Sequence, residues 1–330
     1  MTKILMTSVR DDEQAAIQDY ATRNQVEIVT SPQPIGEVLE LTADVDGVVI
    51  QQRDPLGKEV YPTLKANGLK QIATRTAGYD MVDLAAAKQN GLKVTNVPAY
   101  SPRSVAEHAL MQIFRLLRKT PEVDRRVAEN DYRWPGLQAK EIHSVTVGII
   151  GVGRIGGALA TLLHALNARV LGYDLKPREE MEGIVEYVSK EELLRQSDVV
   201  SLHVDLNPTS EGLLTKAEFD QMKPGASLVN ASRGPVVNTA DLINALKDGP
   251  LAFTALDTVE GEGPIFNADH RQDGLKGEPL VEELHAMDNV ILTPHIAFFT
   301  NIAVQNMVDI SLDDVITILN GQPSEHEVAN

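Results

Sequence analysis

The segment that most constrains the fold is "VTVGIIGVGRIGGALATLLHAL", residues 145–166, in which an apolar run meets three glycines and a helical pattern. The run predicts a buried strand, and the apolar spacing after the glycines predicts a helix packed against it. Gly151 permits the tight turn, Gly153 lets backbone amides approach a pyrophosphate, and Gly156 lets the helix pack on the strand. Because a helix N-terminus carries positive partial charge, this order predicts a dinucleotide-binding turn.

The next predicted strand, "ARVLGYD", ends in Asp174. An acidic residue about 20 residues after such a turn accepts hydrogen bonds from the adenosine ribose hydroxyls and repels a 2′-phosphate. We therefore expect NAD rather than NADP, although Lys176 and Arg178 partly offset the negative charge. The turn residues expected at the cofactor are Gly151, Gly153, Arg154, Ile155 and Gly156.

Strands and helices alternate along the rest of the chain, which predicts an α/β protein with two doubly wound parallel sheets, one Rossmann-like and one flavodoxin-like. Strands of the first sheet are expected at residues 3–8, 26–29, 47–52, 69–75 and 92–97, with helices at 11–24, 37–42 and 81–91. Strands of the second sheet are expected at residues 145–150, 168–174, 197–204, 226–232, 251–257 and 289–295.

Two further helical patterns lie at the joints between these series, at residues 101–129 and 301–319. The second pattern could return the chain to the first sheet. We therefore predict a discontinuous substrate domain, residues 1–100 and 300–330, around an NAD-binding domain of residues 101–299. The chain would cross between the domains twice, which places the expected active site in a cleft at the crossings.

Composition narrows the classes of function. A chain of 330 residues exceeds one ordinary core, in line with two domains. It has no cysteine, so it has no disulfide, no thiolate nucleophile and no cysteine-bound metal. No apolar run reaches the ~20 residues of a membrane span, and the N-terminus lacks signal-peptide architecture, so we expect a cytoplasmic protein. The net charge of −17 disfavours nucleic acid and anionic membranes as partners.

His295, in "TPHIAFFT", follows a predicted strand of the second sheet, where open α/β sheets bind ligands. No acidic residue or histidine stands at metal-ligand spacing around it, and no nucleophile-elbow sequence supports a serine hydrolase, so we expect no metal. A core histidine or a catalytic acid remain as interpretations. His203, in "SLHV", also ends a strand and is expected to line the cofactor site.

Two other predicted strands end in charged residues that could act with His295. Arg233 follows one strand, and Asp257, Glu260 and Glu262 follow the next. An arginine can hold a carboxylate in bidentate fashion, and a histidine can give a proton to a carbonyl oxygen as hydride arrives. A carboxylate beside the histidine favours its protonated form. This combination predicts reduction of a 2-oxo acid.

Six motifs resemble those of the D-isomer-specific 2-hydroxyacid dehydrogenases, in order and over nearly the whole chain. They are "TRTAGYDMVDL", "NVPAYSPRSVAEHAL", "VGIIGVGRIGG", "MKPGASLVNASRGPVV", "ALDTVEGE" and "NVILTPHIAF". The resemblance implies the following roles: substrate binding by Arg233, proton donation by His295, pairing with it by Glu262, contact with the nicotinamide carboxamide by Asp257, and carboxylate binding by the amides near Ala77 and Gly78. It also implies the D-product and a homodimer with the helix from Ser101 in its interface.

Within the family, "YSPRSVAEHA", "NDYRW" and "EGEGPIFN" are most similar to members that reduce pyruvate to D-lactate with NADH. Several positions depart from that pattern, which leaves bulkier 2-oxo acids, such as 2-oxoisocaproate or phenylpyruvate, as the alternative. Gln51, Tyr79 and Phe299 are expected at the substrate pocket, whereas Arg154 is expected near the pyrophosphate and Asp205 at the rim of the adenine pocket. A small apolar substrate pocket is expected from Tyr100, Phe298 and Trp134.

Two rival interpretations share this architecture. Formate dehydrogenases pair the histidine with glutamine, and Glu262 argues against that activity. An NAD(H)-sensing corepressor need not keep the arginine, acid and histidine together, and this chain keeps all three.

Overall fold

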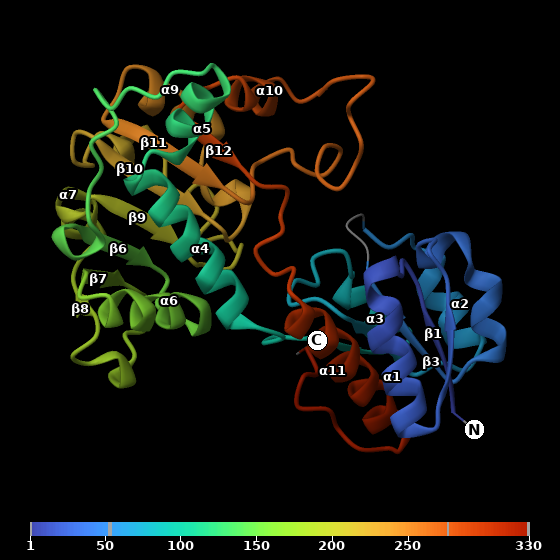
Figure 1. Cartoon of the computed structure of the whole chain (residues 1–330). Coiled ribbons are helices and arrows are strands. Elements are labelled where there is room, and N and C mark those ends of the chain that lie inside the picture. The colour runs from blue at the N-terminus through green and yellow to red at the C-terminus, as the bar shows by residue number, and fades with distance from the viewer. Residues whose placement is uncertain (1, 52–54, 276, 329–330) are drawn as a thin grey trace. The chain divides into compact units, whose positions relative to one another are not determined.

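The computed structural model describes residues 2–51, 55–275 and 277–328. The chain divides into two compact units (Figure 1). The first unit joins Met1–Ser101 to Phe299–Asn330, and the second is Pro102–Phe298. Both units are built on parallel sheets, which confirms the predicted fold class. Which unit binds the substrate and which binds the cofactor is a separate question of function.

The first unit holds a five-stranded parallel sheet in the order β2-β1-β3-β4-β5, the flavodoxin-like order. Its strands are β1 Lys3–Met6, β2 Glu27–Thr30, β3 Gly47–Ile50, β4 Gln71–Thr74 and β5 Lys93–Thr95. All five were predicted, with ends that differ by a few residues. Gln52, the last residue of the predicted third strand, lies outside the described residues.

Helices cover both faces of this sheet. They are α1 Gln14–Asn24, α2 Val60–Ala66, α3 Leu84–Gln89 and α11 Asn301–Leu319. On one face Ile4 and Met6 pack with residues of α1 and α11, while on the other Leu5 packs with residues of α2 and α3. Helix α11 has the predicted bounds and lies beside α1 (Figure 1). It comes so close to β3 that a Cβ on Gly47 would lie 2.4 Å from Val315 Cγ1.

One predicted helix of this unit is wrong in type. Residues 37–42 form parts of two 3-10 segments, η2 Ile35–Glu37 and η3 Leu39–Asp44, rather than an α-helix. Val38 lies between them with φ −135° and ψ 32°, outside helical geometry, so the turns cannot join. A third 3-10 turn, η1 Asp11–Glu13, precedes α1.

The second unit holds a seven-stranded parallel sheet in the order β12-β11-β10-β9-β6-β7-β8. Its strands are β6 Thr146–Ile150, β7 Arg169–Tyr173, β8 Glu186–Tyr187, β9 Val199–Leu202, β10 Ala226–Asn230, β11 Leu251–Leu256 and β12 Val290–Leu292. Strand order reverses between β6 and β9, as in the Rossmann fold. The glycine turn that follows β6 therefore lies at the switch point where such sheets bind ligands.

The helices of the second unit include one correction. They are α4 Pro102–Leu117, α5 Thr120–Ala128, α6 Arg154–Ala165, α7 Lys190–Gln196, α8 Lys216–Phe219, α9 Thr239–Lys247 and α10 Pro279–His285, with 3-10 turns η4 Ile142–Ser144, η5 Glu179–Met181 and η6 Gly234–Val236. The single helix predicted at residues 101–129 is two helices. Lys119 takes the left-handed conformation at φ 54°, and Pro121 cannot continue an α-helix from the preceding turn.

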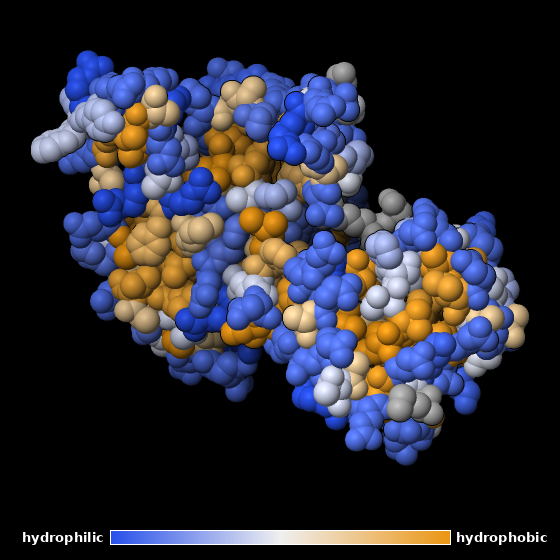
Figure 2. Space-filling view, turned by 45° about the vertical axis from the view of Figure 1, so that its right-hand side comes forward, coloured by the Kyte–Doolittle hydropathy of each residue, from blue (hydrophilic) through white to orange (hydrophobic). Residues whose placement is uncertain are grey.

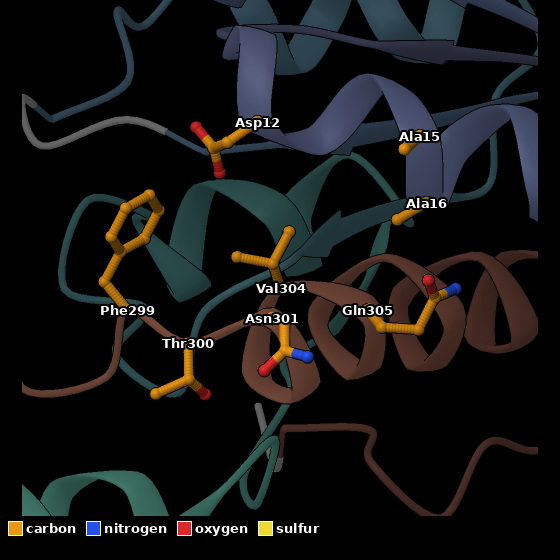
Figure 3. A pocket seen from close by; sticks show the side chains of 8 residues that line it. All are labelled: Asp12, Ala15, Ala16, Phe299, Thr300, Asn301, Val304 and Gln305. Atoms are coloured by element: carbon orange, nitrogen blue, oxygen red, sulfur yellow. The ribbon is translucent and has the colours of Figure 1, made fainter.

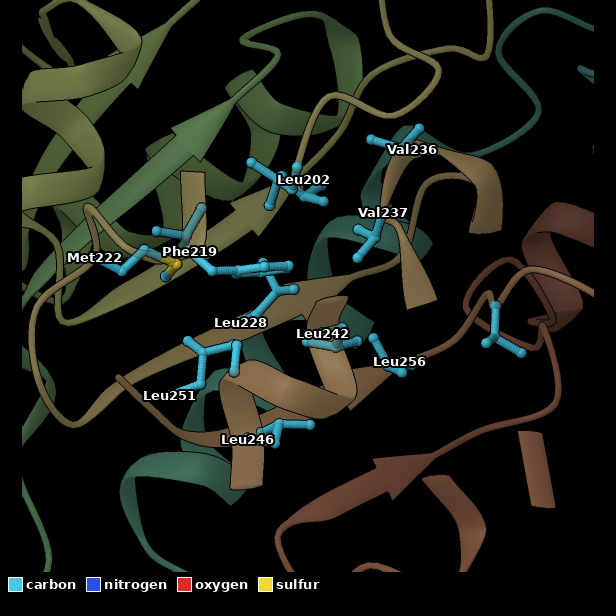
Figure 4. Close-up of a cluster of buried hydrophobic side chains, with 14 of the residues drawn as sticks. Leu202, Phe219, Met222, Leu228, Val236, Val237, Leu242, Leu246, Leu251 and Leu256 are labelled. Atoms are coloured by element: carbon cyan, nitrogen blue, oxygen red, sulfur yellow. The ribbon is translucent and has the colours of Figure 1, made fainter. Parts of the chain in front are cut away.

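Two apolar clusters lie on the two faces of this sheet. One joins Leu228 and Leu256 to the helices α8 and α9 (Figure 4). The other joins Ile149 to α4 and α6, which pack against each other. Hydrophilic residues cover much of the visible surface of each unit, with hydrophobic patches between them (Figure 2). Among the described residues, no helix is long and apolar enough to span a membrane.

Candidate active site

The glycine turn after β6 has the shape that a dinucleotide requires. Gly151 has φ 90°, and a Cβ there would lie 2.5 Å from the His203 carbonyl oxygen. A Cβ on Gly156 would lie 2.0 Å from the Gly151 carbonyl oxygen. A Cβ on Gly153, by contrast, would meet no atom within 4 Å. Packing thus requires the outer two glycines, while the backbone at Gly153 faces open space that a phosphate can enter.

Helix α6 begins at the turn with Gly153 as its N-cap, and no side chain caps it. A helix N-terminus without a side-chain cap, which carries positive partial charge, suits phosphate binding. Arg154 is exposed and Ile155 is half-buried. Both residues belong to the first helical turn, where the sequence predicts them.

Asp174 lies directly after β7 and is held against the same turn. Its carboxylate accepts hydrogen bonds from the amides of Val152, at 2.7 Å, and Lys176, at 2.8 Å. Arg178 donates from Nη1 to the Gly153 carbonyl oxygen at 2.8 Å and pairs with Glu180. The guanidinium of Arg178 thus faces a carboxylate of its own, which limits how far it offsets the charge of Asp174.

His203 lies at the end of β9, beside the turn. Its Nε2 is 2.8 Å from Ser201 Oγ, and its buried Nδ1 has no hydrogen-bond partner within the described part of the chain. Burial lowers the pKa of His203 from 6.5 to about 4, because no neighbouring acid compensates the loss of water. The ring is therefore neutral near pH 7.

Of the charged residues predicted at the strand ends, His295 and Glu262 are in direct contact. His295 Nδ1 is 2.6 Å from Glu262 Oε1, and 32% and 21% of the two side chains are exposed. Glu262 Oε2 also accepts a hydrogen bond from the Val259 amide at 2.8 Å, so the carboxylate is fixed on both sides. Nε2 of His295 has no hydrogen-bond partner among residues that the structure describes. The imidazole is thus oriented at one nitrogen and available at the other.

The backbone at His295 is held in an unusual conformation. Its φ is 57°, the left-handed region that costs a non-glycine residue of order 1–3 kcal/mol. Asp257, which is buried after β11, accepts hydrogen bonds from the Thr293 hydroxyl at 2.6 Å and from the amides of Ile296 and Ala297 at 3.0 and 2.8 Å. Both of its oxygens therefore bind the His295 loop. Its expected contact with the nicotinamide carboxamide stays a prediction.

Arg233 lies after β10 in extended conformation, half-buried, with Nη1 donating to the Ser232 carbonyl oxygen at 2.8 Å. The side chain of Asn230 accepts from the Ser232 amide and donates to the Arg233 carbonyl oxygen, which fixes the turn. A Cβ on Gly234 would lie 2.3 Å from the Val259 carbonyl carbon. The Arg233 turn thus packs against the turn that carries Glu262.

The other predicted substrate residues divide between the units. Phe298, in the second unit, sets its ring edge-on to His295, with centroids 6.5 Å apart. In the first unit, Ala77 and Gly78 follow β4, and their carbonyl oxygens accept from Asn96 Nδ2 at 2.7 Å and Thr76 Oγ1 at 2.6 Å. Their amides donate to none of the residues that the structure describes, so these amides are free to bind an anion.

Tyr100 and Trp134 differ in how they are held. The Tyr100 carbonyl oxygen accepts from Asn306 Nδ2 at 2.6 Å, which ties the end of the Met1–Ser101 segment to α11. Trp134 lies after α5 and is 87% exposed. Its expected contribution to the substrate pocket stays a prediction.

Two of the positions that depart from the family pattern meet at one arginine. Arg10 donates from Nη1 to Gln51 Oε1 at 2.5 Å, and its guanidinium carbon lies 5.6 Å from the ring centre of Phe299. Phe299 also borders a hollow of about 320 Å³ between α1 and the start of α11, with Asp12 and Val304 among its lining residues (Figure 3). This arrangement was not predicted, because Arg10 is distant in sequence from both contacts.

Sequence reasoning also missed three polar residues behind His295. His108 and Gln112 project from α4, and their side chains contact Thr293. The sequence offered no signal for this contact, because it depends on how α4 packs against the ends of β11 and β12. No group of histidine and acidic side chains suited to a metal occurs among the described residues.

A family model described as D-isomer specific 2-hydroxyacid dehydrogenase, NAD binding domain, matches residues 110–297. A D-lactate dehydrogenase of Staphylococcus aureus strain Mu50 is 39% identical over 322 residues, which cover 97% of each chain. A solved D-lactate dehydrogenase from Sporolactobacillus sp. is 51% identical, with 100% of this chain and 99% of that chain covered and a TM-score of 0.89. The structure of a D-2-hydroxyisocaproate dehydrogenase is 33% identical, covers 100% of both chains and has a TM-score of 0.93.

Proposed function

The chain belongs to the D-isomer specific 2-hydroxyacid dehydrogenase family, and from this premise we propose that it reduces pyruvate to D-lactate with NADH. Membership confirms the resemblance drawn from the six motifs, and it makes the chain an NAD-dependent D-2-hydroxyacid dehydrogenase. The observation that carries the proposal is the hydrogen bond of 2.6 Å between His295 Nδ1 and Glu262 Oε1. It leaves Nε2 as the ring atom that can carry a transferable proton.

In the proposed reaction NADH supplies a hydride to the carbonyl carbon of the 2-oxo acid, and one proton must reach the carbonyl oxygen. His295 donates that proton from Nε2 as a general acid. Glu262 places a carboxylate oxygen against Nδ1, which fixes the ring and decides which nitrogen faces the substrate. The 2-oxo acid, NADH and one proton thus become the 2-hydroxy acid and NAD⁺.

The anionic substrate needs positive groups, because the chain itself carries a net charge of −17. We propose that the guanidinium of Arg233 holds the carboxylate and polarises the carbonyl. The packing of its turn against the Glu262 turn supports this role. The open amides of Ala77 and Gly78 support their proposed role as further donors to the carboxylate.

The choice of 2-oxo acid depends on the side-chain pocket. The first unit fixes Gln51 and Phe299 against Arg10, so the two departures from the family pattern are not independent. We infer that these polar groups favour a small substituent such as the methyl group of pyruvate, because a long aliphatic chain would displace water from them without offering hydrogen bonds. The structural likeness to a D-2-hydroxyisocaproate dehydrogenase keeps bulkier acids as the alternative.

The test is a panel of 2-oxo acids with NADH, scored by kcat/KM and by chiral analysis of the product. We expect pyruvate to be preferred and D-lactate to be the only enantiomer formed. A preference of tenfold or more for 2-oxoisocaproate or phenylpyruvate would assign the alternative activity. Binding of NADH without oxidation by any member of the panel would contradict an enzyme of this class.

We also propose that the chain forms a homodimer through α4, α5 and the loop that follows. Exposed apolar side chains gather in this part of the second unit, which an isolated chain would leave in water. They are Met111, Val127, Tyr132 and Trp134. Analytical ultracentrifugation should give twice the 36.0 kDa chain mass. Replacing Trp134 with Ser should weaken the dimer, whereas Leu175→Ser, an exposed control in the same unit, should not.

A further inference from the structure

Helix α4 directs two polar side chains toward the strand end that bears His295. Only 10% of the His108 side chain is exposed, and Gln112 is buried. His108 Nε2 lies 3.2 Å from Thr293 Oγ1 and 3.5 Å from Asp257 Oδ1. A largely covered histidine beside the buried carboxylate of Asp257 requires an explanation, because both groups lose water.

The hydrogen-bond directions around His108 can be assigned by starting from Arg115, which can only donate. Arg115 Nη1 donates to Gln112 Oε1 at 3.2 Å, which identifies the Gln112 amide nitrogen as the atom near His108. That nitrogen is 3.1 Å from His108 Nε2 and can only donate. Nε2 is therefore the acceptor and unprotonated. A ring that accepts from Gln112 at Nε2 is neutral, with its proton on Nδ1.

The electrostatics agree with a neutral ring. Burial lowers the pKa of His108, and the cation Arg115 on the same helix acts in the same direction. The carboxylate of Asp257, at the end of β11, acts in the opposite direction but does not prevail. Thr293, which faces the ring from the end of β12, is uncharged.

The charge of His108 is important because Asp257, its neighbour, holds the loop that carries His295. The Thr293 hydroxyl gives its proton to Asp257, and the remaining capacity of that carboxylate holds the amides of Ile296 and Ala297. These amides directly follow His295, whose positive φ requires outside support. A protonated His108 would place a second N–H against Asp257 and Thr293 and would lose the bond from Gln112.

We propose that His108 is a positioning residue for His295, and that its neutral form, set by Gln112, keeps the Asp257 carboxylate on the His295 loop. Protonation of His108 at acid pH then loosens the loop and lowers the catalytic rate. The inference rests on the proposed function only in taking His295 as the proton donor.

The test compares His108→Gln with His164→Gln, a matched change at an exposed histidine of α6. We expect His108→Gln to lower kcat with pyruvate by about tenfold at neutral pH through misplacement of the donor. KM and the Kd of NADH should stay within about twofold, because uniform binding is untouched. The acid limb of the wild-type kcat profile should be missing in His108→Gln and retained in His164→Gln.

A second variant keeps the test decisive if His108→Gln folds poorly. Gln112→Leu removes the donor that opposes protonation of His108, so the acid limb should move to higher pH. Nuclear magnetic resonance titration of the cofactor-free protein should show the His108 ring titrating with the same midpoint as that limb. An acid limb unchanged in both variants would overturn the inference. A wild-type protein inactive on every 2-oxo acid would instead contradict the proposed function.

Discussion

Each unit places an acid and a base together at the carboxyl end of its parallel sheet, and the two pairs differ in exposure. In the first unit, Arg75 Nε lies 2.7 Å from Glu13 Oε1, and neither side chain is exposed. In the second, His295 Nδ1 lies 2.6 Å from Glu262 Oε1, and both side chains are partly exposed. The separations are nearly equal, so distance alone cannot tell the roles of the two pairs apart.

The difference lies in the hydrogen-bonding capacity that remains. Arg75 also donates to the Thr7 and Ser8 carbonyl oxygens, so its guanidinium is occupied on every side that the structure describes. This pair holds the ends of β1 and β4 together and supports Ser8 at φ 53°. His295, by contrast, keeps Nε2 open. A charged pair at a sheet edge therefore indicates catalysis only when one partner still has an unfilled donor or acceptor that is accessible.

The largest effect should follow from removing His295, the accessible member of the second pair. His295→Ala should lower kcat by about 10²–10⁴-fold, since general acid catalysis is lost. Its melting temperature should change little, because the residue is partly exposed and strained. The control is His285→Ala, at the exposed end of α10. An unchanged kcat in His295→Ala would remove this residue from the mechanism.

The matching change in the buried pair should act on folding instead. Glu13→Gln leaves the Arg75 charge buried without a counter-charge, which should cost about 3–5 kcal/mol of unfolding free energy. Urea denaturation measures this cost, with Glu40→Gln, at an exposed position of η3, as the control. A loss below about 1 kcal/mol, the range of a surface pair, would mean that Arg75 and Glu13 are not the buried scaffold described above.

His203, a half-buried histidine whose Nδ1 is buried, extends the comparison to a base without an acidic partner. Its pKa of about 4 lies below the 6.5 of an unfolded histidine, so the unfolded state binds more protons between these values. The unfolding free energy should therefore fall as pH falls from 6.5 to 4, by up to about 3 kcal/mol from this group. His203→Gln should remove that part of the pH dependence. Equal slopes for the variant and the wild type would contradict a neutral buried ring.

Much of the fold could be predicted because it depends on local patterns. Apolar runs located the strands, and the glycine spacing located the turn after β6. Helix α11 was predicted to the residue, since Thr300 caps its N-terminus and Gly321 follows its end. The break at Lys119 was missed because the apolar face continues across it, although Pro121 was a visible signal.

The positions of the candidate site residues could be predicted only where these residues follow strand ends. Arg233, Glu262 and His295 do so, and parallel strands bring their carboxyl ends to one edge of the sheet. The contacts between distant elements that hold the strand ends in place could not be predicted. His108 reaches Thr293 across 185 positions of sequence, and Arg75 reaches Glu13 across 62. Neither contact leaves a periodic or motif signal, because each depends on how distant elements pack.

The most direct test of the proposed proton donor is the one with the smallest expected change in free energy. Glu262→Gln keeps the shape of the pair and removes its charge, so the proton donor loses the carboxylate that faces Nδ1 at 2.6 Å. The kcat of pyruvate reduction should fall by about tenfold or more, while the unfolding free energy stays near that of the wild type. Equal kcat values for Glu262→Gln and the wild type would contradict the claim that this pair prepares the proton donor.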